Sequence, residues 1–244
     1  MCTVTFIPTK KGIAITSNRD EHLSRGKATA PIKTASKTIE LIYPKDPDAG
    51  GTWIATKNNG DTIVLLNGAF EKHISQPPYA KSRGLILLEI FNLENFTESI
   101  HQFDLTNIEP FTIVYYLNNQ LFEFRWNSKE RFLRELDIHH SYIWSSATLY
   151  NTEISNKRKE WFKQWQLRNL SPSQYEIIHF HLTAGDGDAY DNLKMNRDNQ
   201  LFTVSISSIL IGKNHSDFIY VDFYGNKTTN ERIFKINNAT PVEL

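Results

Sequence analysis

The first 21 residues, MCTVTFIPTKKGIAITSNRDE, contain two β-branched segments separated by the turn-forming residues Thr9-Lys10-Lys11-Gly12. Such a pattern predicts a β-hairpin at the start of the chain. If these four residues form the loop, Pro8 pairs with Ile13. The same register then places Cys2 directly opposite Arg19.

Cys2 is the sole cysteine in the 244 residues. If Met1 is removed, Cys2 carries a free α-amine and a thiol, whose ordinary pKa values are about 7.7–8.0 and about 8.5. Such a residue can serve as nucleophile and general base together. In the predicted register the Arg19 guanidinium would lower the pKa of the thiol, because cross-strand Cβ atoms lie about 4.5–5.5 Å apart. The alternative is a small, buried, unreactive cysteine.

The polar tetrad Asn18-Arg19-Asp20-Glu21 follows the second apolar segment. A hairpin loop one residue shorter or longer would bring Asn18 or Asp20 opposite Cys2. In each register a carboxylate and a guanidinium arrive at the amino end of the chain. A carboxylate can orient an α-ammonium group, and a guanidinium can hold a substrate carbonyl or carboxylate. The alternative interpretation is a charged turn that ends a strand.

The composition argues against several classes of protein. Lys plus Arg and Asp plus Glu number 27 each, and this balance disfavours nucleic acid or an anionic membrane surface as the main partner. A single cysteine excludes an internal disulfide framework and a multi-cysteine zinc site, as is typical of a reducing compartment. There is no signal-peptide pattern and no apolar stretch of about 20 residues. We therefore expect a soluble cytoplasmic protein without integral membrane association.

The pattern of segments predicts alternating groups of strands and helices. Strands are expected at residues 3–7, 12–18, 52–56 and 62–66, in a meander at 111–117, 121–126, 131–136 and 141–145, and at 202–211, 218–223 and 232–236. Helices are expected after the N-caps Ser82 and Ser173, at 96–103 and from residue 155. Residues 27–51 are expected to form a surface loop or lid.

This order favours two mostly antiparallel sheets packed together with helices outside. We therefore predict an α+β protein with a four-layer α/β/β/α sandwich, formed by one domain over residues 1–244.

Cys2 followed by Asn18-Arg19-Asp20-Glu21 resembles the opening of the NRDE family, which includes the transport-and-Golgi-organisation protein 2 homologues. The resemblance covers nearly the whole chain. The further matching pieces are Arg25, Pro31, Gly50-Gly51-Thr52-Trp53, Leu66-Asn67-Gly68, Ser82-Arg83-Gly84, Phe180-His181 and Ala184-Gly185-Asp186-Gly187-Asp188.

The resemblance implies an N-terminal-nucleophile hydrolase fold, similar to that of penicillin V acylases and bile-salt hydrolases. In those enzymes the amino-terminal cysteine attacks an amide carbonyl, an aspartate binds its amine, and asparagine side chains with backbone N–H groups hold the oxyanion. The resemblance thus assigns the nucleophile and base to Cys2, the ordering of amine and substrate to Asp20 and Arg19, and the oxyanion to Asn67. One oxyanion donor lowers the barrier by about 3–4 kcal/mol.

Four more residues, Asn18, Glu21, Trp53 and Ser146, are expected to contact the substrate. The resemblance implies no metal and no organic cofactor. The sequence departs from the acylase pattern at three places, where Ser17, Ser146 and Ser205 stand at positions expected to hold arginine or asparagine.

Three functions follow from these features. The first is an amide or thioester hydrolase acting on a small, partly apolar molecule. The second is a non-catalytic binder or carrier of an apolar ligand such as haem or a lipid acyl compound, because NRDE relatives are linked to haem handling and lipid metabolism. The third is a structural or interaction protein with an inert Cys2.

Two further clusters have structural interpretations. The first is a structural loop or an edge of the substrate site, with a metal site as the alternative, and the second is a packing surface, with a ligand groove as the alternative. His179 and His181 lie two residues apart on a predicted helix and so point to different faces, and Asp186-Gly187-Asp188 is too short for a calcium loop. Trp161 and Trp165 are one helical turn apart and are expected to pack on a sheet.

Overall fold

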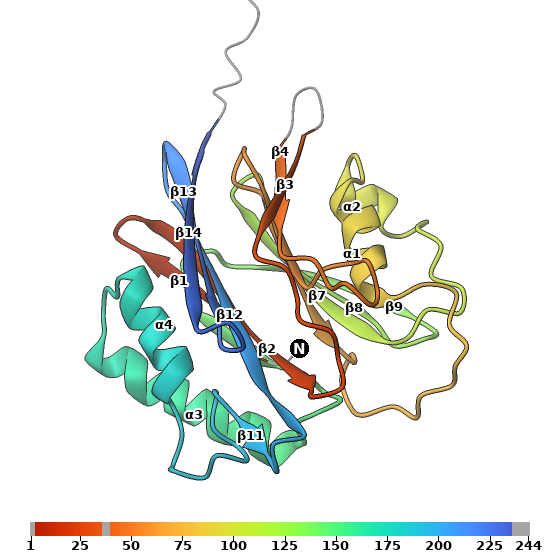
Figure 1. The fold of residues 1–244 in the computed structure, drawn as a ribbon. Coiled ribbons are helices and arrows are strands. Elements are labelled where there is room, and N and C mark those ends of the chain that lie inside the picture. The colour runs from red at the N-terminus through yellow and green to blue at the C-terminus, as the bar shows by residue number, and fades with distance from the viewer. Residues whose placement is uncertain (1–2, 36–39, 236–244) are drawn as a thin grey trace, which may run out of the picture.

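The computed structural model describes residues 3–35 and 40–235, which form two antiparallel sheets packed face to face (Figure 1). The first sheet has the order β10 (Tyr142–Ser145), β1 (Thr3–Thr9), β2 (Gly12–His22), β12 (Leu201–Ile211), β13 (His215–Asp222) and β14 (Lys227–Phe234), with β11 (Asn196–Arg197) paired to β12. The second has the order β3 (Ile32–Ala35), β4 (Glu40–Tyr43), β5 (Ile54–Lys57), β6 (Thr62–Asn67), β7 (Phe111–Leu117), β8 (Gln120–Trp126) and β9 (Arg131–Leu136).

Four helices cover the outer faces of the sheets in the described part of the chain. The helices α3 (Thr152–Arg168) and α4 (Gln174–Thr183) lie on the first sheet, whereas α1 (Arg83–Phe91) and α2 (Phe96–Ser99) lie on the second (Figure 1). The predicted α+β class and four-layer α/β/β/α sandwich are confirmed. Ser82 and Ser173 are the N-caps of α1 and α4, as their sequences predicted.

Alternation along the strands distributes apolar side chains among three buried clusters. On β1, Val4 and Phe6 belong to the cluster between the sheets, whereas Ile7 belongs to the cluster beneath α3 and α4. A third cluster, which includes Leu87 and Phe111, lies between the second sheet and α1 and α2. Both sheets are therefore covered on both faces by packed side chains.

The opening hairpin has the predicted register. Pro8 pairs with Ile13, and Thr3, the first described residue, pairs with Asn18. The strand β2 continues to His22 because it also pairs with β12 along its far side. The tetrad 18–21 therefore lies within a central strand, and its interpretation as a terminal turn is wrong.

Two expectations about the strands are wrong. Residues 27–51 are not wholly irregular, because β3 and β4 extend the second sheet there. The strand β10 does not continue the meander but crosses to the first sheet and pairs with β1. The short strands β3 and β4 lie at an edge of the second sheet, and β10 pairs with a strand that is distant in the sequence. Local patterns of hydrophobicity do not identify such partner strands.

Smaller differences concern boundaries. The second helix ends at Ser99 rather than at 103, and α3 begins at Thr152, directly after the N-cap Asn151. The last strand begins at Lys227, and Ile236 lies outside the described residues.

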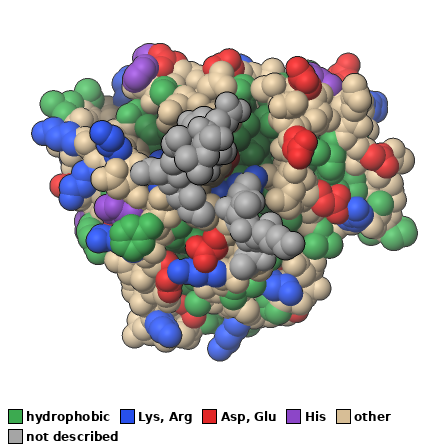
Figure 2. Space-filling view, turned by 90° about the horizontal axis from the view of Figure 1, so that it is seen from above, with side chains coloured by type: hydrophobic (Ala, Val, Ile, Leu, Met, Phe, Trp, Pro, Cys, Tyr) green, Lys and Arg blue, Asp and Glu red, His purple; other side chains and the backbone are tan. Residues whose placement is uncertain are grey.

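The surface agrees with the balanced composition. On the face shown in Figure 2, basic and acidic side chains are interspersed rather than gathered by sign. No helix among the described residues is long and apolar enough to cross a membrane.

Candidate functional site

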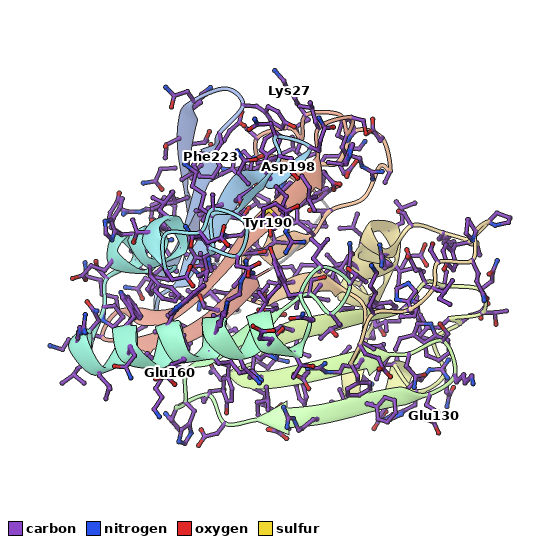
Figure 3. The ribbon with its side chains drawn as sticks, turned by 90° about the horizontal axis from the view of Figure 1, so that it is seen from below. Lys27, Glu130, Glu160, Tyr190, Asp198 and Phe223 are labelled. Atoms are coloured by element: carbon purple, nitrogen blue, oxygen red, sulfur yellow. The ribbon has the colours of Figure 1, made fainter. Side chains whose placement is uncertain are left out.

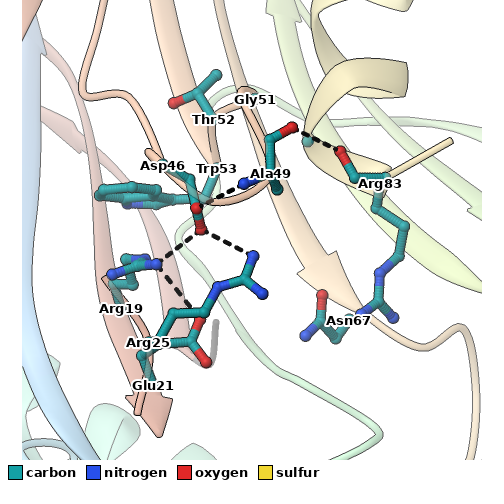
Figure 4. Close-up of a pocket in the computed structure, with 12 residues that line it drawn as sticks. Arg19, Glu21, Arg25, Asp46, Ala49, Gly51, Thr52, Trp53, Asn67 and Arg83 are labelled. Carbon is teal, nitrogen blue, oxygen red and sulfur yellow. Dashed lines mark hydrogen bonds and ion pairs between the residues drawn. The ribbon is translucent and has the colours of Figure 1, made fainter. Parts of the chain in front are cut away.

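A polar cavity of about 170 Å³ opens between the end of β2 and the facing wall of the second sheet (Figure 4). Its wall comes from both sheets, from the loop after β4 and from the start of α1. The lining residues are Arg19, Glu21, Arg25, Asp46, Ala49, Gly51, Thr52, Trp53, Asn67, Ser82, Arg83 and Gly84.

Arg19 is a fully buried cation in this wall, with only 1% of its surface exposed. Its Nη2 donates to Asp46 Oδ2 at 2.8 Å and to Glu21 Oε2 at 3.4 Å. The guanidinium carbon lies 4.7 Å from the centre of the Trp53 ring. Carboxylate hydrogen bonds and an aromatic face together compensate the loss of water around the charge.

Asp46 joins two arginines within the cavity. Its Oδ2 accepts from Arg19 and, at 3.1 Å, from Arg25, while its Oδ1 accepts the backbone N–H groups of Asp48 and Ala49. Burial alone would raise the pKa of this carboxyl, but the Ala49 N–H and the two guanidinium groups outweigh burial and hold the pKa below its ordinary value. Asp46 is therefore a carboxylate that already has its full set of donors.

Asn67 ends β6 at the opposite side of the cavity (Figure 4). Its Oδ1 is buried and has no hydrogen-bond partner among the described residues. Its backbone carbonyl accepts the Ser146 hydroxyl at 2.9 Å. Gly68, with φ of +79°, follows it, and a Cβ there would lie 3.1 Å from Ala147 and Thr148 side-chain carbons. Glycine therefore allows the loop after β10 to lie against the end of β6.

Asn18 and Asp20 point to the other face of β2, as strand alternation requires. Asp20 is buried and accepts hydrogen bonds from the hydroxyls of Tyr150, at 2.7 Å, and Thr203. Asn18 donates to the Leu193 carbonyl at 2.8 Å and also contacts His181. These contacts tie β2 to the helical layer outside the first sheet.

Arg158 of α3 belongs to this same outer network and is fully buried. It donates to Thr3 Oγ1 at 2.6 Å and to the carbonyls of Asp191 and Asn192, and its guanidinium carbon lies 3.5 Å from the centre of the Tyr150 ring. The two carbonyls belong to the segment between α4 and β11, close to Tyr190, which is labelled in Figure 3. The Tyr190 hydroxyl donates to Asp198 at 3.0 Å. Arg158 thus anchors the first described residue of β1.

The structure brings four of the predicted site residues to one cavity, namely Arg19, Glu21, Trp53 and Asn67. Asn18 and Asp20 lie on the opposite face of the same strand. Ser146 contacts the Asn67 backbone without lining the cavity. Cys2 lies outside the described residues.

Several residues of the site were not predicted as site residues from the sequence. Asp46 precedes Pro47-Asp48, a pattern typical of an Asx turn, so the local sequence could have indicated the orientation of its side chain. For Arg83, its place directly after the N-cap Ser82 was a weaker indication. No local pattern indicates Tyr150 or Arg158, because their hydrogen-bond partners lie more than a hundred residues away in the sequence.

No set of three His, Cys, Asp or Glu side chains in residues 3–35 and 40–235 is placed to share a metal ion. The functional groups that line the cavity are three guanidinium groups, two carboxylates and the Asn67 amide, beside hydroxyl and indole groups.

Solved structures with a similar fold include two variants of the conjugated bile acid hydrolase from Clostridium perfringens, one cysteine-to-alanine and one arginine-to-leucine. They share 10% identity with this chain at TM-scores of 0.57 and 0.58, and the alignments cover 95% and 94% of this chain and 92% of each hydrolase chain. The N-acylethanolamine-hydrolyzing acid amidase ortholog of Caenorhabditis elegans has a TM-score of 0.52 and 13% identity, covering 87% of this chain and 94% of that one. At such identities the likeness establishes the fold alone, an N-terminal-nucleophile hydrolase-like sandwich.

Among curated protein sequences there is no significant match. A family model described as Transport and Golgi organisation 2 matches residues 1–234, which is nearly the whole chain. With its opening cysteine, its Asn-Arg-Asp-Glu strand and this fold, the chain belongs to the Transport and Golgi organisation 2 family.

Proposed function

We propose that this protein is an N-terminal-cysteine acyl hydrolase that cleaves an amide or thioester bond of a small molecule. The observation that carries the proposal is the meeting of Arg19 and Asn67, which come from different sheets, in one small polar cavity. The confirmed hairpin register supports it, because Cys2 is bonded to Thr3, and the partner of Thr3 in β2 directly precedes Arg19. The hydrolase-like fold supports the same class of reaction.

In the proposed reaction, removal of Met1 exposes the α-amine of Cys2, which takes the thiol proton. The thiolate forms a bond to the carbonyl carbon, and the π electron pair moves to the oxygen, which accepts a hydrogen bond from Asn67 Nδ2. Collapse of this oxyanion expels the amine or thiolate, which takes a proton from the α-ammonium. Water then hydrolyses the resulting thioester, which releases a carboxylic acid and restores the thiol.

Arg19 and Asp20 have different parts in this proposal. Arg19, on the cavity side of β2, stabilises the thiolate or the substrate carbonyl. Asp20, held on the other side by Tyr150 and Thr203, orders the α-ammonium group at the end of the strand. Both roles follow from the proposal that Cys2 is the nucleophile.

The size of this cavity suits the proposed reaction better than it suits haem or a lipid bound at the same place. Its volume of about 170 Å³ is below the range of about 300–1,000 Å³ that is typical of pockets for drug-sized ligands. Its wall also holds five charged side chains. Such a space suits the reacting polar group of a small molecule.

The decisive experiment follows Cys2, which any thiol reagent reports without ambiguity because it is the only cysteine. Intact mass of the purified protein should show that Met1 is absent. Iodoacetamide should label Cys2 at mildly acidic pH, because a pKa below about 8.5 leaves more thiolate there. A panel of N-acyl aminocoumarins and chromogenic thioesters should then yield a single acyl adduct and turnover.

The variant Cys2→Ala should lose the adduct and the turnover while its circular dichroism and melting temperature remain those of the wild type. Retention of Met1, or equal turnover by Cys2→Ala, would overturn the proposal.

A further inference from the structure

The cavity contains two arginines besides Arg19. Arg25 and Arg83 both line it, and in the view of Figure 4 their side chains approach Asn67 from two directions. The carboxylates of the cavity are already engaged, since Asp46 accepts from Arg19, Arg25 and two backbone N–H groups. Glu21 is likewise held by Arg19, at 3.4 Å.

Arg25 retains unused donors. Its Nη2 donates to Asp46 at 3.1 Å. Its buried Nε lies 3.7 Å from Asp48 Oδ2 and has no hydrogen-bond partner within the described ranges. A guanidinium has five N–H donors in a planar fork that matches a carboxylate. With 38% of its side chain exposed, Arg25 can turn this fork to an incoming ligand.

Arg83 is held in place from behind the cavity. Glu109, which does not line the cavity, contacts Arg83 Nη2 at 2.9 Å, and the Pro110 carbonyl accepts from Nη1 at 3.3 Å. These two contacts fix the plane of the guanidinium and leave its other N–H groups for a ligand.

The start of α1 adds further donors to the same wall. The Leu85 N–H is capped by Ser82, but the N–H groups of Arg83 and Gly84 have no partner among the described residues. First-turn N–H groups and the helix dipole favour an anion at this end of the helix. Trp53, which is 1% exposed, also lines the cavity, and its buried Nε1–H has no acceptor in residues 3–35 and 40–235.

We infer that Arg25, Arg83 and the first turn of α1 form an anion subsite. This subsite binds a carboxylate group of the same molecule whose acyl bond is cleaved. The inference rests on the proposed function for its place in a reaction, because Asn67 joins the anion subsite to the proposed oxyanion hole. The substrate class is then an acyl compound that carries a carboxylate close to the scissile bond. The donors that recognise the carboxylate are Arg25, Arg83 and the first turn of α1.

The test is calorimetric binding to the full chain carrying Cys2→Ala, which prevents acyl transfer. N-acetylglycine supplies the carboxylate, and N-acetylglycinamide is its neutral counterpart of the same shape. The carboxylate probe should bind at least tenfold more tightly. Raising the salt concentration from about 0.05 M to about 0.5 M should weaken the binding of this probe alone, because ions screen a partly exposed subsite.

Arg25→Gln should remove most of the difference between the two probes and leave the binding of N-acetylglycinamide unchanged. Arg25 is the variant of choice because it is partly exposed, and Arg83→Gln should act in the same direction if its melting temperature shows a folded protein. The matched control is Arg232→Gln, which removes an exposed arginine that binds Asp217 on the far side of the first sheet. It should behave as the parent.

Equal affinity for the two probes, failure of both to bind, or an equal loss in Arg232→Gln would overturn the inference. The two proposals fail separately. Selective binding of N-acetylglycine without acyl transfer by the wild type would contradict only the proposed acyl hydrolysis. Acyl transfer without any preference for a carboxylate would contradict only the anion subsite.

Discussion

His181 shows how a single buried side chain connects the helical layer to the opening strands. Its Nε2 lies 2.8 Å from Thr5 Oγ1, and its Nδ1 is hydrogen-bonded to Asn18 Oδ1. Complete burial, reinforced by the nearby Arg158 charge, lowers the pKa of His181 to about 3. The folded protein therefore keeps this imidazole neutral across the physiological range, as a structural group rather than a base.

The free energy of unfolding should decrease as the pH is lowered, because of His181. Its folded pKa lies below the ordinary value of 6.5, so the unfolded chain binds the proton first and acid favours unfolding. The loss begins near pH 6.5 and continues down to the folded pKa, and it amounts to about 2 kcal/mol by pH 5. Urea unfolding at pH 7, 6 and 5 measures it.

Two histidine variants separate this effect from general acid sensitivity. His181→Gln should be less stable at pH 7 but should lose this part of the pH dependence. His179→Gln, on the exposed side of the same helix, should keep the wild-type dependence. Parallel pH curves for wild type and His181→Gln would contradict the argument.

At the scale of the elements, the cavity depends on how closely α1 approaches the loop before β5. A Cβ at Gly51 would lie 2.3 Å from the Gly84 carbonyl carbon, and a Cβ at Gly84 would lie 2.8 Å from the Thr52 carbonyl oxygen. The two backbones therefore touch, with the Thr52 N–H donating to the Gly84 carbonyl at 3.4 Å. This contact places the first turn of α1, and with it Arg83, in the wall of the cavity.

Gly84→Ala should destabilise the protein, although alanine is the better helix former. Alanine would contribute about 0.5–1 kcal/mol in a free helix, but its Cβ would overlap the Thr52 carbonyl and cost about 1–3 kcal/mol. The midpoint of urea unfolding should fall, and binding of N-acetylglycine should weaken because the helix start is displaced. Leu85→Ala, the next residue, is partly exposed and should change stability by about 0.5 kcal/mol or less. A more stable Gly84→Ala protein would contradict this close approach of the two backbones.

At the scale of the whole molecule, charged pairs cross between the two sheets at two depths. Arg19 of the first sheet meets Asp46, which follows β4 of the second, inside the cavity wall. At the sheet edges, Lys33 of β3 lies 3.6 Å from Glu231 of β14, where both side chains are exposed. The two pairs make the same kind of connection in different surroundings.

Asp46→Asn should therefore cost far more stability than Glu231→Gln. Removing the buried carboxylate leaves Arg19 without its shortest charged contact, which should cost about 3 kcal/mol. Removing the exposed one should cost about 0.5 kcal/mol or less. Urea unfolding of both variants at pH 7 measures the difference, and comparable losses would contradict it. Because the pKa of Asp46 is lowered, its contribution should be present at neutral pH and lost as pH falls through the folded pKa.

The amino-acid sequence was sufficient to predict the class of the fold, the opening hairpin with its register, and the helix caps at Ser82 and Ser173. These features depend on residues close together in the chain, where alternation, turn chemistry and capping act directly. It also indicated Arg19, Glu21, Trp53 and Asn67 as site residues, but not that they share a cavity.

The surroundings of those residues depend on long-range contacts of the folded chain and could not be predicted from the sequence. Local patterns say which face of a strand is apolar, but they do not name the distant segment that packs on that face. Asp46 reached Arg19 through the β3–β4 hairpin, and Tyr150 reached Asp20 because β10 crossed to the first sheet. The physical reason is burial. A charged group away from water requires an oppositely charged or hydrogen-bonding partner, and in the folded chain that partner can come from a segment far away in the sequence.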